Sequence, residues 1–431
     1  GLDGVLMAAR LSGLPPNLAS RFTPGTLISS HEVYEAVKRG IAVPFRKSDP
    51  EVIRHISRLQ AADRGGMMFQ PAPGIYENVE EIDFTSMYPT IIVQSNLSPE
   101  TIEHPERAGF LPAALKPLLD LRINTKRLKK TDPRFAGIDS ILKWMLVTCF
   151  GYTGYKNAKF GRIEVHEGIT ARSRDILVRT KDIAEDQGFT VLHGIVDCLW
   201  VQGPAVAGLK QKVEDEIGIL TEIEHFSWIV FLPMNDGCGA YNRYFGRLSD
   251  GSIKVRGIAA RRHDTPEFVR SMQAEMLEVM AGTESIAALQ SKQEVIGNIF
   301  KKAVRCLAAA DPKTLVINRR ISRLTYAHRC LEGAAVQAYR NRGIEIAPGM
   351  KIGYVVRDAR TYSVDTGWDA AVFDLPYYNN LLEKAWQEIA FVFRTTPSKP
   401  LTELGMECCL KRSDSPQATF IALTHNLSYE E

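Results

Sequence analysis

Residues 81–92 read EIDFTSMYPTII, and this stretch carries more information about the fold than any other part of the chain. Asp83 lies near the end of a β-favouring run that includes Val79, Ile82 and Phe84. A Ser-Met-Tyr-Pro break follows this run. Strand-end carboxylates are typical metal ligands in α+β enzymes. For an isolated Asp-Phe pair, an Asp that caps the following helix is about as frequent. The rest of the chain must therefore discriminate between a metal site and a helix cap.

The composition is that of a large globular protein. A chain of 431 residues is too long for one hydrophobic core and predicts two to four subdomains. No apolar run approaches the roughly 20 residues of a membrane span, and no signal peptide is visible. The seven cysteines include no CxxC pair, which argues against a zinc ribbon and a disulfide framework. We expect a cytoplasmic protein with no membrane partner.

Apolar periodicity and breakers predict the order of the secondary structure. A strand ends at Asp83, a short helix follows it, and three longer helices cover 111–130, 138–150 and 166–187. A hairpin is predicted from 190–193 and 196–201 with Gly194-Ile195 at its turn, and Asp250-Gly251 marks a second turn. Beyond it we expect a mainly helical stretch from about 265 to 340, then a β segment at 352–356 and a helix at 381–393.

The first long helix after Asp83 is strongly basic. Residues 116–134 hold seven basic and two acidic side chains, and Arg122 and Lys126 lie four apart on one helix face. An ordinary solvated face explains such a run more often than a binding site does. Lys143 on the next helix has its own simple explanation, because a lysine on an apolar helix can extend to the surface. If Arg122, Lys126 and Lys143 face one space, they form a clamp for a polyphosphate.

The predicted hairpin contributes Asp197, which lies between Val196 and Cys198 and precedes an apolar Leu-Trp-Val run. A carboxylate in such surroundings is costly to bury unless it is paired or binds a metal. An Asp in a tight hairpin turn is also common. Two strand-borne carboxylates, Asp83 and Asp197, beside a basic helical clamp indicate two-metal phosphoryl or nucleotidyl transfer.

Taken together, these residues resemble the polymerase half of family-B DNA polymerases, from near the start of the chain to about residue 393. Six elements follow the family's order: DFTSMYP at 83–89, the Arg122/Lys126 pair, KWMLVTCFG at 143–151, HGIVDC at 193–198, YNRY at 241–244, and KVRG at 254–257 with RRHD at 261–264. The resemblance implies an α+β right-hand fold, in which an antiparallel palm sheet carries helical fingers and a mainly helical thumb. Palm segments would be 76–110 and 161–264, fingers 111–160 and thumb 265–393, with an N-terminal segment 1–75 and a tail 394–431.

The resemblance also implies roles for individual residues. Asp83 and Asp197, with the Phe84 carbonyl, would bind two magnesium ions, with manganese as an alternative. Arg122, Lys126 and Lys143 would grip the triphosphate of a dNTP. The remaining nucleotide-binding residues would be Ser86, Tyr88, Thr148 and Phe150, with Tyr88 under the sugar. Primer-template DNA would contact Tyr241, Arg243, Tyr244, Lys254 and Arg256 and the thumb residues Arg319 and Arg320, although a solvated loop explains the last two equally well.

Four positions depart from the family pattern. Ile195 replaces the first acid of the third palm motif, Val147 replaces an Asn, Phe150 a Tyr, and Asn242 a Lys. Loss of the acid at Ile195 should weaken metal affinity without abolishing it, and Val147 and Phe150 could loosen base selection. The pattern resembles a divergent archaeal branch of family B with a degraded third motif, regarded as inactivated or specialised for damaged templates.

We therefore expect template-directed DNA synthesis that is slow or of low fidelity, in replication, repair or translesion synthesis at the nucleoid. The chain shows no acidic exonuclease motif of suitable spacing, so we expect no proofreading in it and leave open a separate exonuclease-bearing or accessory subunit. The main alternative is a catalytically impaired, polymerase-derived subunit that binds or scaffolds DNA. A metal-dependent nuclease is a third possibility, in which the polyphosphate clamp would have no purpose.

Overall fold

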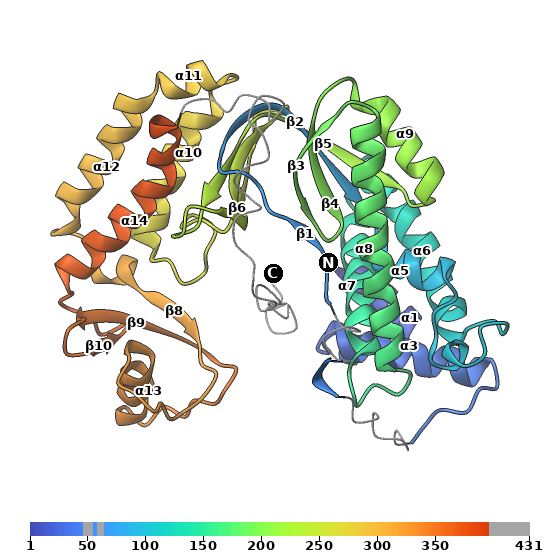
Figure 1. Cartoon of the computed structure of the whole chain (residues 1–431). Helices are drawn as coiled ribbons and strands as arrows, with labels where there is room; N and C mark the ends of the chain where they lie inside the picture. The colour runs from blue at the N-terminus through green and yellow to red at the C-terminus, as the bar shows by residue number, and fades with distance from the viewer. Residues whose placement is uncertain (46–54, 58–63, 396–431) are drawn as a thin grey trace. The chain divides into compact units, whose positions relative to one another are not determined.

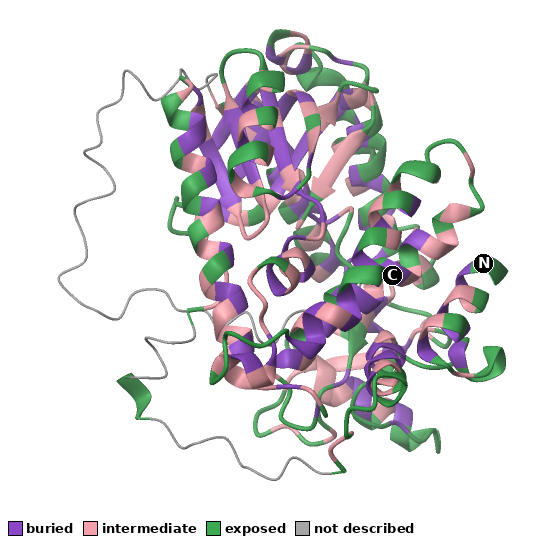
Figure 2. Ribbon diagram, turned by 90° about the vertical axis from the view of Figure 1, so that its right-hand side faces the viewer, coloured by how far each residue is buried: buried purple, intermediate pink, exposed green. Residues whose placement is uncertain are grey.

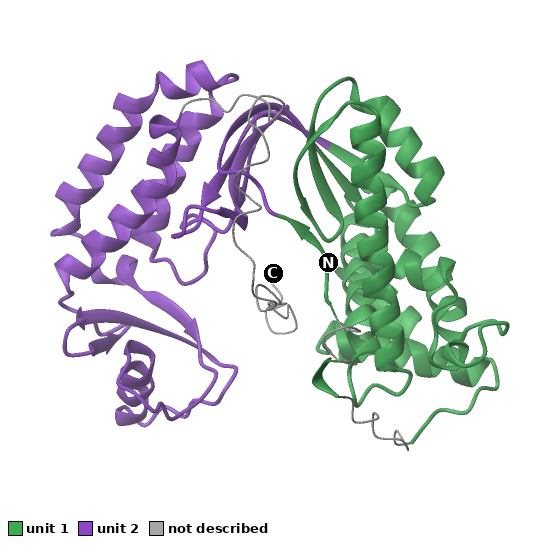
Figure 3. Ribbon diagram, viewed as in Figure 1, with its two compact units in different colours: residues 1–69, 81–223, 404–431 green, residues 70–80, 224–403 purple. Residues whose placement is uncertain are grey.

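The structure is a computed structural model that describes residues 1–45, 55–57 and 64–395. Two compact units divide these residues (Figure 3): unit 1 comprises 1–69 and 81–223, and unit 2 comprises 70–80 and the described residues from 224 onward. Each unit has a hydrophobic core of its own. Figure 2 shows buried residues on the strands and on the inner faces of the helices, as expected for amphipathic elements. The expectation of more than one subdomain is in line with this division.

Seven strands form the main sheet, in the order β1-β3-β4-β2-β5-β6-β7 (Figure 1). The pairs β1/β3, β3/β4, β5/β6 and β6/β7 are antiparallel. The boundary between the units falls within β2 and β5. The strands are β1 (Met68–Phe69), β2 (Gly74–Phe84), β3 (Thr190–Ile195), β4 (Cys198–Gln202), β5 (Thr221–Pro233), β6 (Gly239–Leu248) and β7 (Ile253–Arg256).

Unit 1 is mainly helical around its strands. The long helix α8 contacts β3 and β4, and the N-terminal helices α1 and α3 pack against α7. Ala8 and Ile28 from these N-terminal helices share one core with Leu142 and Met145 of α7. The helices of this unit are α1 (Leu2–Ser12), α2 (Pro16–Ala19), α3 (Pro24–Lys38), α5 (Met87–Gln94), α6 (Phe110–Leu128), α7 (Phe135–Thr153), α8 (Ile163–Asp186) and α9 (Val206–Ile217), with a 3-10 turn at Pro99–Ile102.

Unit 2 combines helices with a small second sheet of order β10-β9-β8. Helices α10, α12 and α14 contact one another and share the core of this unit with β9. Asp374 begins α14 by accepting a hydrogen bond from the Tyr377 amide, as an N-cap residue does. The remaining elements are α10 (Glu267–Ala281), α11 (Ile286–Gln290), α12 (Gln293–Leu307), a 3-10 turn at Pro312–Leu315, β8 (Ile317–Arg320), α13 (Leu331–Asn341), β9 (Lys351–Asp358), β10 (Ser363–Thr366) and α14 (Leu375–Arg394).

Most predicted elements are present. The strand through Asp83, the three long helices, the segment at 352–356 and the helix at 381–393 all occur, with ends shifted by a few residues. Asp250-Gly251 does form the β6–β7 turn, where Gly251 adopts a φ of 87° and Asp250 accepts from the Ser252 amide. The structure confirms the expected fold class, helices with an antiparallel sheet. No helix in the described part of the chain is long and apolar enough to cross a membrane.

One prediction of local structure was wrong. The hairpin turn lies at Val196-Asp197 and not at Gly194-Ile195, because Ile195 pairs with Cys198 and Gly194 with Leu199. Gly194 is a strand residue whose missing side chain admits the Phe69 ring, since a Cβ there would lie 2.6 Å from Phe69. The stretch from about 265 to 340 is mainly helical as predicted, and it also contains the short strand β8, which carries Arg319 and Arg320. The predicted tail begins at residue 394, and its residues after 395 lie outside the described part of the chain.

Candidate metal and nucleotide site

Strand β2 delivers Asp83 to one end of the main sheet in unit 1. Beyond it the chain turns sharply, because Ser86 adopts a left-handed φ of 56° before α5 begins. Ser86 is the N-cap residue of α5, so Asp83 lies too far upstream to be its cap. The Phe84 amide donates to the Asp197 carbonyl (2.9 Å) and the Thr85 amide to the Leu220 carbonyl (2.8 Å). The helix-cap alternative for Asp83 is therefore excluded.

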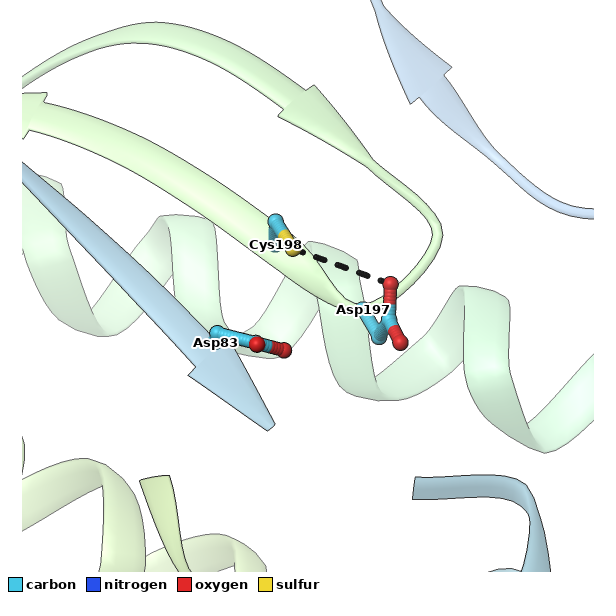
Figure 4. A group of neighbouring side chains, drawn as sticks. All are labelled: Asp83, Asp197 and Cys198. Carbon is cyan, nitrogen blue, oxygen red and sulfur yellow. Dashed lines mark hydrogen bonds between the residues drawn. The ribbon is translucent and has the colours of Figure 1, made fainter. Parts of the chain in front are cut away.

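Asp197 lies in the two-residue turn between β3 and β4, where it faces Asp83 (Figure 4). One ligand atom each from Asp83, Asp197 and Cys198 lie within 4.8 Å of one another. The Cys198 thiol donates to Oδ1 of Asp197 at 3.7 Å. The sequence named both carboxylates, and the tertiary structure brings them together.

The electrostatics of this pair favour a cation. Burial, followed by the negative charges of Asp83 and Glu81, raises the pKa of Asp197 to about 7. Two carboxylates that repel each other in this way form a site that a divalent ion would stabilise. Magnesium prefers oxygen ligands, so the carboxylates suit it and the Cys198 sulfur does not. The donor set therefore fits a hard divalent cation held by Asp83 and Asp197.

Arg122 is engaged with another helix. Its guanidinium is buried and forms an ion pair with Asp139 of α7, which also binds Nζ of Lys129 at 2.6 Å. The two cations hold the pKa of Asp139 below its usual range against the opposing effect of burial. In this structure Arg122 thus fastens α6 to α7 through Nη1, and its contact with a triphosphate stays a prediction.

Lys126 contacts Thr85, which lies two residues after Asp83. Its Nζ donates to Oγ1 of Thr85 (3.1 Å) and forms an ion pair with Glu222 (2.7 Å). These side chains border a cavity of about 320 Å³ with four basic and two acidic residues in its wall: Lys126, Arg127, Lys130, Lys210, Glu214 and Glu222. An excess of positive charge in a cavity next to the DFTSMYP segment is suited to a phosphate-bearing ligand.

Phe150 and Tyr88, two of the predicted nucleotide-binding residues, are in direct contact. Their ring centroids lie 4.1 Å apart, and the Phe150 ring also stacks on His166 at 4.4 Å. Burial raises the pKa of Tyr88 to about 12, so its phenol stays protonated at neutral pH. Lys143 is exposed on α7, whereas Thr148 is buried, so these two residues do not face the same environment.

The predicted DNA-binding residues lie in unit 2, and several have protein partners there. Arg243 pairs with the buried Glu388 of α14 (2.9 Å), and Lys254 pairs with Glu224 (2.6 Å). Tyr244 is 3% exposed and packs on Phe231, which gives it a role in the core. Tyr241 is half-buried and Arg256 is exposed.

Arg319 lies on β8, where Asp264 (2.9 Å) and Glu332 (3.7 Å) neutralise it. Arg320 donates to the Gly349 carbonyl at 2.9 Å. Neither arginine is therefore in a loop, the alternative explanation that the sequence left open for them.

Sequence reasoning missed four residues at this site. Glu81 lies two positions before Asp83 and so on the same face of β2, a period-two signal that was available. Asp139 and Glu222 gave no such signal, because their partners lie 17 and 96 residues away in contacts that only folding creates. Cys198 adjoins Asp197 in the sequence, but a thiol next to a carboxylate was not assigned a role there.

Comparisons with known proteins agree with the geometry of the site. Residues 35–108 match the model of the family described as "DNA polymerase family B". DNA polymerase 2 of Saccharolobus solfataricus is 30% identical over 371 residues, which cover 83% of this chain and 55% of that protein. The chain is a relative of the family-B DNA polymerases.

One further relative and one solved structure also match the chain. DNA polymerase 2 of Aeropyrum pernix is 27% identical over 81% of this chain and 45% of its own length. The structure of the family B DNA polymerase from the hyperthermophilic archaeon Pyrobaculum calidifontis matches the fold with a TM-score of 0.62 at 24% identity, and covers 92% of this chain and 54% of that one. This family-B relative thus spans about half the length of the curated relatives it matches.

Proposed function

We propose that this family-B relative catalyses template-directed DNA synthesis, transferring a nucleotidyl group from a dNTP to a primer 3′ end. The observation that carries the proposal is the convergence of Asp83 and Asp197 within ligand distance of a common ion. Primer-template DNA and dNTP would be its substrates, as the names of its relatives imply for those proteins. A separate exonuclease-bearing or accessory subunit, and association with the nucleoid, belong to the same proposal.

The Asp83 and Asp197 carboxylates, with the Phe84 carbonyl, would hold the divalent cations, for which the oxygen donors favour magnesium over softer metals. Two such ions, when bound, would activate the primer hydroxyl and neutralise the triphosphate. Both carboxylates must be ionised to bind a cation, so Asp197 would give up the proton that its raised pKa allows it to hold near neutrality.

The other residues would bind and orient the nucleotide. Lys126 and Lys143 would take the triphosphate, with Arg122 joining them once it leaves Asp139. Tyr88, kept neutral and backed by the Phe150 ring, would present a flat apolar face to the sugar. With Val147 and Phe150 in place of polar groups, base selection would rest on shape, from which we expect a raised misincorporation frequency in primer extension.

Primer extension tests the proposal directly. Asp83→Asn and Asp197→Asn should each abolish incorporation, because each removes a charged ligand while keeping the shape of the side chain. Asp175→Asn on α8 is the matched control, since this carboxylate is exposed and lies outside the site. If the Asp83 and Asp197 variants form as much product as the unaltered chain, the proposal is refuted.

A non-catalytic DNA-binding subunit is the second candidate. Its supporting observation is that, within the described ranges, the metal-ligand group holds two carboxylates and one thiol, with Ile195 where the family has another acid. This candidate predicts salt-dependent primer-template binding without incorporation. Ile195→Asp discriminates between the two: a gain in rate marks a weakened but working site, whereas continued inactivity with intact DNA binding favours the subunit.

A further inference from the structure

A short segment from the N-terminal region lies against the hairpin that carries Asp197. Residues 65–69, which we call the strap, include β1 and pair with β3 in the register Met68↔Ile195 and Phe69↔Gly194. The Val196 amide donates to the Met67 carbonyl at 2.9 Å. The strap thus extends the sheet as far as the turn that presents Asp197.

The turn that the strap covers is strained. Val196 has a φ of +53°, a left-handed conformation that β-branched residues rarely adopt. Two-residue hairpin turns with a positive φ at their first position normally place Gly, Asn or Asp there. Residues in such conformations persist only where surrounding contacts enforce them, so the contacts around Val196 must supply that constraint.

A hydrogen bond and a close approach place the start of the strap beside Val196. Arg174 of α8 donates from Nη1 to the Gly65 carbonyl at 2.7 Å and so fastens the start of the strap to a long helix. Gly66 lies so close to the turn that a Cβ on it would be 2.8 Å from Cγ2 of Val196 and 3.7 Å from the Tyr88 hydroxyl.

The other end of the strap is held by the hairpin itself. Nδ1 of the buried His193 lies 2.7 Å from the Phe69 carbonyl, and the Phe69 ring occupies the space that Gly194 leaves free. The strap is thus held at this end by β3 and at its start by the Arg174 hydrogen bond.

We propose that Arg174, acting through the strap, is a positioning residue that holds the Val196 turn in its strained conformation and thereby keeps Asp197 facing Asp83. The inference rests on the proposed function in one respect, namely that these two carboxylates bind a divalent cation. Arg174 touches neither the cation nor the substrates in this scheme. Its effect passes through the Gly65 carbonyl and the Val196 amide.

Manganese binding to the whole chain, without DNA or nucleotide, is the first measurement. Titration calorimetry should show that Arg174→Ala lowers Mn²⁺ affinity about tenfold, the loss expected for one charge-assisted hydrogen bond. Arg174→Lys should recover part of the affinity, because a lysine can still donate to the Gly65 carbonyl. Arg172→Ala, an exposed arginine on the same helix, should leave affinity unchanged. Gly66→Ala should lower affinity by displacing the turn.

Hydrogen exchange gives a readout that needs no metal. The Val196 amide, protected by the Met67 carbonyl, should exchange faster in Arg174→Ala, whereas amides in the middle of α8 should not. Val196→Gly relieves the strain, so Arg174→Ala should cost less Mn²⁺ affinity in that background than in the unaltered chain.

Equal Mn²⁺ affinity in Arg174→Ala and the unaltered chain, or losses that simply add in the double variant, would overturn the inference. Absence of Mn²⁺ binding by the unaltered chain would overturn it as well. Arg174-dependent Mn²⁺ binding in a chain that extends no primer would instead support the inference while refuting the proposed function.

Discussion

Glu32→Gln is expected to remove most of the pH dependence of the stability of the α3–α7 pair in unit 1. Glu32 is 4% exposed on α3, and the Cys149 thiol of α7 donates to its Oε1 at 3.6 Å. Burial raises the pKa of Glu32 to about 7 from an ordinary value of 4.5. The same burial and the neighbouring Glu32 raise the pKa of Cys149. Both groups are therefore neutral in the folded chain in mildly acidic solution.

The sign and size of the effect follow from linkage. Between pH 4.5 and 7 the folded chain keeps the Glu32 proton and the unfolded chain loses it, so stability falls as pH rises. The raised pKa of Glu32 corresponds to about 3 kcal/mol of folding stability, because each pKa unit is worth about 1.4 kcal/mol. This stability is fully lost above pH 7. Glutamine keeps the shape without the charge. We therefore expect Glu32→Gln to match the unaltered chain near pH 4 and to exceed its stability at pH 8.

Hydrogen exchange of α3 and α7 amides, read by mass spectrometry at several pH values and corrected for intrinsic exchange, is the suitable assay, because a chain of two units need not unfold in one step. Asp175→Asn, an exposed carboxylate in the same unit, is the control and should leave the profile unchanged. A Glu32→Gln chain whose opening free energy still falls between pH 5 and 8 as much as the unaltered chain's would refute the reasoning.

Two further substitutions probe the basic clamp. Asp139→Asn leaves Arg122 buried without a counter-ion, so we expect the stability of unit 1 to fall by about 3–5 kcal/mol. Chemical denaturation would measure this loss, and an unchanged midpoint would show that the ion pair does not stabilise the unit. Glu222→Gln frees Lys126 for the triphosphate, and because the pair is partly exposed the KM for dNTP should fall by no more than about fivefold. Steady-state primer extension would measure this, and a higher KM would show that Glu222 helps to position Lys126.

The predictability of the fold differed between local and long-range features. Helices such as α6 and α8 were predictable because their apolar periodicity is local to the sequence. The β3–β4 turn was misplaced because Gly194 is a usual turn residue, whereas a left-handed Val196 is not. Only pairing with β1 and β4 fixes the register there, and those partners are remote or equally ambiguous in sequence.

The sequence alone identified Asp83, Asp197 and Lys126 as candidates for binding a cation and a triphosphate, because their residue types occur within motifs. The tertiary structure decided which of them meet. It brings Asp83 and Asp197 together, engages Arg122 with Asp139, and turns Lys126 toward Glu222. The physical reason is that an ion pair depends on distance in space and on the burial of its partners, and chain folding sets both.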